Sequence, residues 1–171
     1  MIYFVKRNQI DEEKYNNCIA TSLQSRMYAY SWYLDIVADN WNVLVLDDYE
    51  AVMPLPFHKK FLISYISQPF FTQQLGVFSK ENITEETIQF FLNTIPKKYL
   101  KIALQFNSDN NLSSENTIDK NNYLLSLDKE YKMLYKSFSK GRKHAINQGL
   151  KEQFIIEEIP FSEVLFLYNE H

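Results

Sequence analysis

The residues whose types and spacing best suit ligand binding form one run, QPFFTQQLG, at residues 68–76. Glutamine amides donate and accept hydrogen bonds, so they suit an amide-rich ligand. Glycine can adopt a positive φ or let the backbone approach a ligand closely. The alternative interpretation is an irregular connection, with Phe70 and Phe71 packed into the core. The candidate substrate-binding residues in this run are Gln68, Gln73, Gln74 and Gly76.

A second candidate is a basic segment at residues 129–151, which carries seven Lys or Arg residues and one acid, Glu130. Its net charge of +6 leaves −9 for the rest of a chain whose total is −3. Such a segment can hold the phosphates of a CoA tail, a tRNA backbone or a lipid head group. The alternative is a solvated helix face. If the segment is one long helix, one face carries the candidate phosphate-binding residues Lys136, Lys140 and Lys143.

Arg142 differs from these lysines, because it lies on the apolar face of the same helix, between Phe138 and Ala145. A guanidinium in such a place is costly unless it is paired. We therefore expect Arg142 either to form a buried or half-buried ion pair, or to point into a site and clamp an anionic group of the substrate.

No set of catalytic residues can be identified from the sequence. The three histidines lie far apart, so a zinc site has no local support, and His58 is expected at the surface. The three glycines do not cluster as a Rossmann fingerprint or a P-loop requires. Cys18 is the only cysteine and is expected to be a small buried hydrophobe, not a nucleophile. No metal and no tightly bound cofactor is expected.

The N-terminus and the hydropathy pattern favour a cytoplasmic protein. Residues 1–7 lack the long apolar region of a signal peptide. No uninterrupted apolar stretch approaches the roughly 18 residues of a membrane span. With only one cysteine, an internal disulfide is impossible, and nothing indicates an oxidising compartment. We expect no transmembrane segment, and the oligomeric state stays open.

The elements that position these residues alternate between strands and helices, which indicates an α/β fold around a mixed sheet. Three helices are expected to begin after the caps Asp11, Thr84 and Ser162. Another should begin at Ser31, with four side chains facing inward: Trp32, Tyr33, Ile36 and Val37. A long helix is expected at 129–148, with Gly149 as its C′ residue. Residues 108–120 should be a surface loop or mobile segment. Pro54 and Pro56 should place their strand at an edge or outside the sheet. Strands are expected at residues 2–5, 41–46, 51–56, 61–67, 100–106, 123–127 and 154–159.

Three strings in this order resemble the first half of FemABX-like proteins, which belong to the wider GNAT acyltransferase superfamily. They are YEAVMPLP, LISYISQPFFTQQLG and NYLLSLDKEYKMLYKSFSKGRKHAINQGLK, within residues 41–150 for the most part. The resemblance implies a GNAT-like mixed β-sheet flanked by helices and followed by a long basic helix. It also implies a GNAT-like N-terminal domain at 1–127, a basic connecting helix at 128–150 and the start of a truncated second domain at 151–171.

The function implied by this resemblance is acyl- or aminoacyl-group transfer, with this chain supplying the N-terminal half and binding the acceptor. The donor would be acyl-CoA or aminoacyl-tRNA, and the acceptor a small molecule or a cell-wall precursor. GNAT enzymes hold the CoA pyrophosphate with a Q/R-x-x-G-x-G/A loop, and the run from Gln73 to Phe78 matches only Q-x-x-G. The alternatives are a non-catalytic GNAT-like module that binds a phosphate-bearing ligand or partner, and RNA binding through the lysine stripe.

Overall fold

The computed structural model describes residues 1–152 and 157–170. The chain divides into two compact units, Met1–Asn122 and Tyr123–His171, and each is described by itself. Among the described helices, none combines the length and the apolar character that crossing a membrane requires.

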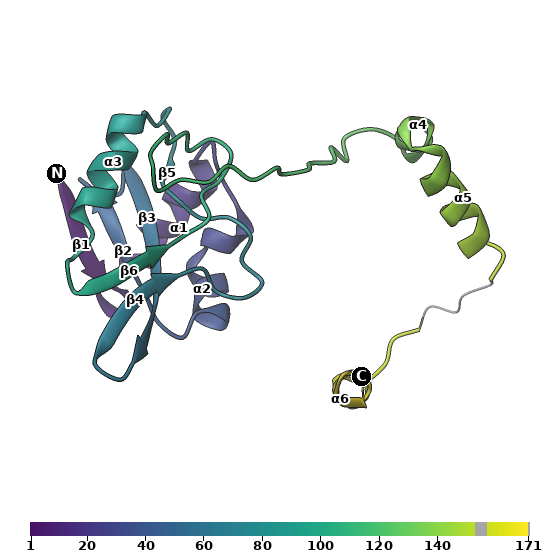
Figure 1. Ribbon diagram of the computed structural model, residues 1–171, viewed down its shortest axis with the longest axis horizontal. Coiled ribbons are helices and arrows are strands. Elements are labelled where there is room, and N and C mark those ends of the chain that lie inside the picture. Colours follow the sequence, from purple (N-terminus) through teal and green to yellow (C-terminus); the bar gives the residue numbers. More distant parts are fainter. Residues whose placement is uncertain (153–156, 171) are drawn as a thin grey trace. The chain divides into compact units, whose positions relative to one another are not determined.

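The first unit is built around a six-stranded mixed sheet with helices on both faces (Figure 1). The strand order is β1-β2-β3-β4-β6, and β5 pairs with β3 beside this path. Neighbours from β1 to β4 are antiparallel, whereas β4 and β6 are parallel. The predicted α/β fold with a mixed sheet flanked by helices is confirmed. The strands are β1 (Ile2–Lys6), β2 (Trp41–Leu46), β3 (Ala51–Lys60), β4 (Ile63–Ser67), β5 (Phe78–Ser79) and β6 (Tyr99–Ala103).

The helices of this unit pack on opposite faces of the sheet. Ile88 and Phe91 of α3 (Glu85–Thr94) are fully buried in one core cluster, together with Leu55 and Ile66 of the sheet. Tyr15 of α1 (Glu12–Thr21) lies in a second cluster, which also contains Leu34 of α2 (Ser31–Val37). Short 3₁₀ helices η1 (Arg7–Gln9) and η2 (Met27–Ala29) precede α1 and α2.

The predicted starts of α1 and α3 are confirmed. Asp11 accepts a hydrogen bond from the backbone N–H of Lys14, and Thr84 accepts one from that of Thr87. Each side chain therefore satisfies one of the backbone N–H groups that have no partner in the first turn of a helix.

The predicted inward face of α2 is wrong for Trp32 and Ile36, whereas Tyr33 and Val37 are half-buried. Trp32 is 52% exposed and Ile36 is 77% exposed, while Ser31 and Leu34 are buried. Ser31 is fixed against α1, because its N–H donates to the side-chain oxygen of Asn16 (3.0 Å) and its hydroxyl accepts from the Asn16 amide (2.8 Å). In a helix of seven residues this contact decides which apolar side chain turns inward.

The two prolines of β3 occupy an interior strand, not an edge strand. The N–H of Phe57 donates to the Asn40 carbonyl on the β2 side (2.8 Å), so alternation directs the nitrogens of Pro54 and Pro56 to the other side. There, β5 pairs only with Ala51 and Val52, and β4 pairs only with the end of β3 from Phe57. Neither proline therefore removes a hydrogen bond of the ladder. Proline is expected in edge strands because it cannot donate such a bond, and that reason does not apply at these two positions.

The β3–β4 hairpin turns later than expected, and two predicted strands differ. The ladder continues to Lys60, and the turn lies at Phe61, which has a φ of 55°, and Leu62. β6 ends at Ala103, three residues before the predicted end. The strand expected at residues 123–127 is wrong, because that stretch is exposed and pairs with no described strand.

The second unit contains α4 (Tyr131–Ser137), α5 (Lys140–Gly149) and α6 (Phe161–Glu170). The predicted single helix over 129–148 is wrong, because the helix is interrupted at Phe138. Ser139 then caps α5 by accepting from the Arg142 N–H (3.2 Å), and serine favours such caps over helix interiors. Gly149 is the last residue of α5 and not the C′ residue. Ser162 lies inside α6 and is not its cap. The strand expected at 154–159 falls largely outside the described residues.

Candidate functional site

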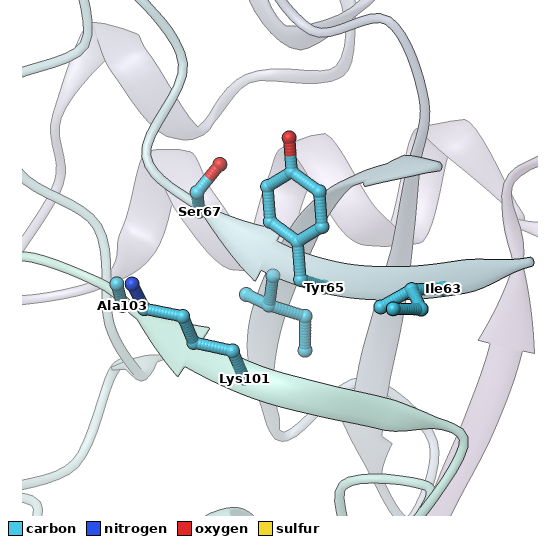
Figure 2. Close-up of a pocket in the computed structure, with 6 residues that line it drawn as sticks. Ile63, Tyr65, Ser67, Lys101 and Ala103 are labelled. Atoms are coloured by element: carbon cyan, nitrogen blue, oxygen red, sulfur yellow. The ribbon is translucent and has the colours of Figure 1, made fainter. Parts of the chain in front are cut away.

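An open cavity of about 310 Å³ lies on the face of the β4–β6 pair opposite α3 (Figure 2). In the described part of the chain, only residues of these two strands line it. Alternation along β4 brings Ile63, Tyr65 and Ser67 to this face, whereas Ile66 packs into the core with α3. Lys101 and Ala103 complete the lining from β6.

The lining from β6 depends on an irregularity in the parallel pairing. Ser64 pairs with Tyr99, but Ile66 pairs with Ile102, so β6 uses one more residue than β4 over this stretch. The extra residue shifts the alternation of β6 and directs Lys101 and Ala103 toward the cavity. Regular alternation from Tyr99 would place Lys101 on the core face, which is why the sequence pattern did not reveal the cavity.

The cavity combines apolar walls with a few polar groups. Ile63, Ala103 and the ring of Tyr65 supply the apolar surface, and Ile66 contributes to the lining from the middle of β4. Figure 2 shows the Tyr65 and Ser67 hydroxyls on one side of β4 and the Lys101 chain running along β6 toward Ala103. Sites of this kind hold a ligand by apolar contact and orient it with few polar groups. The cavity therefore suits a ligand that has an apolar part and an anionic or hydrogen-bonding group.

A carboxylate–imidazole pair lies next to the cavity. His58 Nδ1 lies 2.8 Å from Asp39 Oδ2, and the His58 ring stacks on the Tyr65 ring at a centroid distance of 5.5 Å. The carboxylate favours the tautomer with hydrogen on Nδ1, which leaves Nε2 able to accept a proton. No local pattern indicates this pair, because Asp39 and His58 are 19 residues apart and meet through the register of β2 and β3.

The glutamines of the 68–76 run mostly support the loop itself. Gln68 accepts from the Gln105 N–H and donates to the Thr72 carbonyl, both at 3.2 Å. Gln74 is buried and accepts from the Arg26 guanidinium (3.3 Å). The exposed Gln73 makes one long contact of 3.4 Å, to the side chain of Asn122. Of the three, Gln73 has the amide most available to a ligand.

Phe70 and Phe71 point outward from the same loop. Each is 88% exposed, so the alternative in which both pack into the core is wrong. The Tyr33 hydroxyl donates to the Phe71 carbonyl (2.5 Å), and Phe71 has a φ of 61°. The loop is thus tied to α2 at the point where its two aromatic side chains are presented to solvent.

Gly76 has the positive φ that the sequence suggested, at 115°. A Cβ there would overlap the side-chain oxygen of Asn110, so close backbone packing also requires glycine. That same oxygen accepts from the Val77 N–H (2.6 Å), and the Leu75 N–H donates to Gln105 (2.8 Å). These N–H groups are already used, so the Q-x-x-G match does not provide a pyrophosphate cradle here.

The basic residues of the second unit differ in their surroundings. Arg142 is exposed, makes no ion pair among the described residues, and lies 5.5 Å from the centroid of the Phe138 ring, so the expected ion pair is wrong. Lys143 donates to the Lys136 carbonyl (2.9 Å). The ammonium groups of Lys136 and Lys140 are exposed and suited to bind phosphate.

Two further features of the described chain concern possible chemistry. No group of three or more His, Cys, Asp or Glu side chains in these ranges is arranged to hold a metal ion.

Burial raises the pKa of the Cys18 thiol to about 11, and its sulfur contacts the Phe78 carbonyl at 3.7 Å. The expectation of a buried cysteine is confirmed, and a thiol with so high a pKa holds little of the nucleophilic thiolate at neutral pH.

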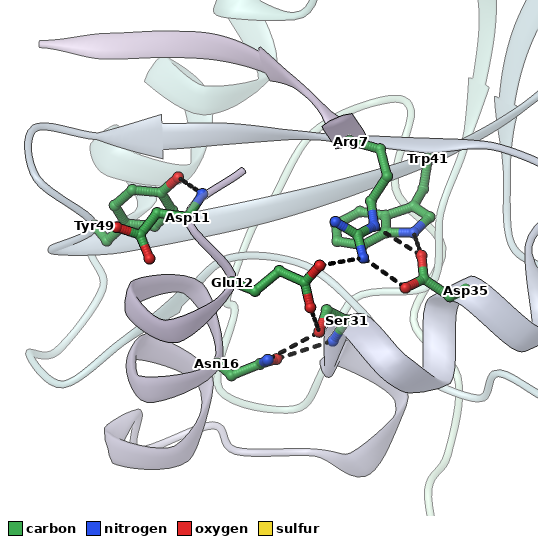
Figure 3. Close-up of polar contacts among 8 residues, drawn as sticks. All are labelled: Arg7, Asp11, Glu12, Asn16, Ser31, Asp35, Trp41 and Tyr49. Atoms are coloured by element: carbon green, nitrogen blue, oxygen red, sulfur yellow. Dashed lines mark hydrogen bonds and ion pairs between the residues drawn. The ribbon is translucent and has the colours of Figure 1, made fainter. Parts of the chain in front are cut away.

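A cluster of charged groups surrounds Arg7, with contributions from α1, α2 and β2 (Figure 3). The guanidinium binds both oxygens of Asp35 at 2.6 and 2.8 Å, and Glu12 at 2.8 Å. Trp41 donates its indole N–H to Asp35 (2.8 Å), and Arg7 lies 5.1 Å from the centroid of its ring. A cavity of about 370 Å³ adjoins this cluster, but Arg7 and Asp35 satisfy each other, so the cluster is better suited to stability than to ligand binding.

Asp35→Asn is expected to lower the free energy of unfolding by about 1 kcal/mol at neutral pH, since the pair is only half-buried and partly screened by solvent. Hydrogen bonds from Arg7, the largest cause, lower the pKa of Asp35. A lowered folded-state pKa stabilises the protein above the unfolded value near 4, and this contribution is lost as pH falls through the folded value.

Chemical denaturation of both proteins from neutral pH to about pH 2 checks this. The difference between wild type and Asp35→Asn should shrink as the medium becomes acidic. Asp48→Asn is the matched control, because its partner Lys14 is also a surface cation, and it should cause little change. A difference that does not depend on pH would contradict the assignment.

Comparison of the chain with protein-family models, with curated proteins and with solved structures finds no match.

Proposed function

We propose that this chain is part of an acyl- or aminoacyl-group transferase of the GNAT/FemABX type, and that Met1–Asn122 binds the acceptor. The observation that carries the proposal is the cavity on β4 and β6, with apolar walls and the polar groups of Tyr65, Ser67 and Lys101. It extends to the carboxyl ends of the two parallel strands, which is where open α/β sheets bind ligands.

The positions of the resembling strings support this proposal. The first two fall on β3 and on β4 with its following loop, so they flank or form the cavity. The third covers α4 and α5, where Lys136 and Lys140 expose their ammonium groups. A donor such as acyl-CoA or aminoacyl-tRNA carries phosphates that these lysines suit.

The loop after β4 supports acceptor binding in preference to donor binding. A pyrophosphate needs free backbone N–H groups, and those of Leu75 and Val77 are already hydrogen-bonded within the unit. The nearest following helix, α3, begins with Glu85 and Glu86, whose charges disfavour an anion at its N-terminus. The acceptor would instead place its apolar part against Ile63 and its anionic group near Lys101.

The chemistry of acyl transfer gives His58 a role in this proposal. The amine or hydroxyl of the acceptor attacks the acyl carbonyl, a new C–N or C–O bond forms, and the bond to the donor's thiol or ribose oxygen breaks. The acceptor loses one proton, and the leaving group gains one. Nε2 of His58, oriented by Asp39 on its other nitrogen, can accept the first proton and return it. Both possible donors are cytoplasmic, so we place the reaction in the cytoplasm.

Ala103→Phe tests acceptor binding, because the larger side chain fills the cavity. Titration of the chain with a water-soluble, nucleotide-linked muramyl peptide, followed by calorimetry, should show binding that this variant weakens at least tenfold, about 1.4 kcal/mol. Ala20→Phe, the same change at an exposed position of α1, should leave binding unchanged. Equal binding by wild type and Ala103→Phe would contradict the proposed site, and so would the absence of binding to any cell-wall precursor.

A second candidate is a non-catalytic module that binds a phosphate-bearing ligand, favoured by the exposed ammonium groups of Lys136 and Lys140. The same titration with CoA or tRNA separates the two functions. Binding of either ligand that is lost in Lys136→Gln/Lys140→Gln and kept in Ala103→Phe, with no turnover of any acyl donor, would favour this candidate.

A further inference from the structure

The tip of the β3–β4 hairpin exposes a run of apolar side chains. Phe61 is 95% exposed, Leu62 is 102% exposed and Ile63 is 50% exposed. Figure 1 shows this hairpin projecting beyond the other strands of the first unit. Single exposed apolar residues are common, but three consecutive ones at a projecting tip form the kind of surface that marks an interaction site.

The same end of the sheet carries positive charge without compensating acids. No Asp or Glu occurs at residues 51–80 or 87–108, which supply β3, β4, the loop after it and β6. Lys59 and Lys60 are exposed on the hairpin. The parallel pairing of Ser64 with Tyr99 brings Lys97 toward the start of β4, whereas the Lys98 ammonium lies over the rings of Phe4 (4.7 Å) and Tyr99 (5.0 Å).

This arrangement places apolar groups and cations on one edge. Leu100, in the irregular stretch of β6, is 72% exposed and adds to the apolar surface at the base of the hairpin. The carboxylate of Asp39 lies near the base of the hairpin, where it pairs with His58. The acids of the unit lie outside β4 and β6, mainly on α1, α2, the β2–β3 turn, α3 and the stretch at 109–119, so these two strands and the segments next to them carry lysines and no acid.

We propose that this edge docks on the surface of an anionic lipid bilayer, with Phe61 and Leu62 inserted at the boundary between head groups and acyl chains. Interfacial segments bind in this way, with apolar side chains about 5–10 Å below the surface and lysines at the level of the lipid phosphates. Each lysine near an anionic surface contributes to binding, and Lys59, Lys60 and Lys97 on this edge act together.

The aliphatic side chains of the edge favour a bilayer over a nucleic acid. Single-stranded nucleic acids are held by aromatic rings on which bases stack. Leu62, Ile63 and Leu100 have no such ring, whereas hydrocarbon accommodates them. A nucleic acid would engage the lysines and leave these three side chains in water.

The test is sedimentation of the full chain with phosphatidylcholine vesicles, with and without phosphatidylglycerol. Wild type should bind only the anionic vesicles, and binding should weaken between about 0.1 M and about 0.5 M salt. Lys59→Gln/Lys60→Gln should weaken binding roughly thirtyfold, and Phe61→Ser/Leu62→Ser at least tenfold. Ile36→Ser, which removes an exposed apolar side chain of α2, is the matched control and should bind like wild type.

All five of these substitutions are at exposed positions, so unchanged melting curves should accompany them. The proposal is overturned if wild type does not bind anionic vesicles, or if both hairpin variants bind as tightly as wild type. It is also overturned if Lys136→Gln/Lys140→Gln abolishes binding while the hairpin variants keep it, since the second unit would then make the contact. Tight binding of a single-stranded oligonucleotide, lost in Lys59→Gln/Lys60→Gln and without vesicle binding, would identify a nucleic-acid surface instead.

Discussion

Gly76→Ala is expected to lower the free energy of unfolding by about 3 kcal/mol. An alanine at the φ of 115° that Gly76 adopts is strained by about 1–3 kcal/mol. Its Cβ would also overlap the side-chain oxygen of Asn110, which is buried and cannot move without losing its bond to the Val77 N–H. A buried donor left without a partner costs about 1–3 kcal/mol.

Urea denaturation of wild type and variant measures this difference. Gly141→Ala is the matched control, because a Cβ at that position of α5 meets no atom within 4 Å and alanine favours a helix. The control should be neutral or stabilise by up to about 1 kcal/mol. A loss below about 1 kcal/mol for Gly76→Ala would show that the loop relaxes freely.

Asn110→Ala is the second change with a large expected effect, again about 3 kcal/mol. The Asn110 side chain accepts from the Val77 N–H (2.6 Å) and donates to the Val77 carbonyl (3.1 Å), so it pairs with Val77 as a neighbouring strand would. Removing it leaves both backbone groups of a buried residue without partners. Denaturation of the variant, together with hydrogen exchange at the Val77 amide, measures the loss.

Asn111→Ala is the control for this change, since its side chain is exposed, and it should stay within about 0.5 kcal/mol of wild type. The double variant Gly76→Ala/Asn110→Ala adds a sharper test. Truncating Asn110 removes the atom that the new Cβ would overlap, so the two losses should fall short of additive by at least about 1 kcal/mol. Additive losses would mean that the two residues do not interact.

The anchoring of Asn110 also changes the interpretation of the polar stretch at 108–120. Its composition predicts a surface loop, and most of it is exposed. Asn110 is nevertheless buried, as is Asn107 just before the stretch, whose side chain donates to the Leu75 carbonyl (3.2 Å). Composition did not distinguish these two asparagines from the exposed ones, because their partners are 32 and 33 residues away.

The GNAT/FemABX resemblance stays a prediction. The sequence drew attention to the glutamines after β4, yet Gln68 and Gln74 mainly hold the loop together. The side chains that form the cavity, among them Tyr65 and Lys101, were not candidates. Hydrogen-bonding capacity can be read from a residue type, but whether that capacity is already used depends on neighbours far along the chain.

The sequence by itself determined the features that depend on residues within one or two turns of each other. These include the caps at Asp11 and Thr84 and the positive φ at Gly76. A cap or a helical face is specified by spacings of three and four residues, so periodicity reveals it.

Only the tertiary structure decided which distant side chains meet. The cavity exists because β6 takes one extra residue between its pairings at Tyr99 and Ile102, and the Asp39–His58 pair exists because of strand register. The inward side of α2 was set by Asn16 of another helix. A shift of one residue in a strand reverses the face of every side chain after it, and no local pattern in the sequence fixes where such a shift occurs.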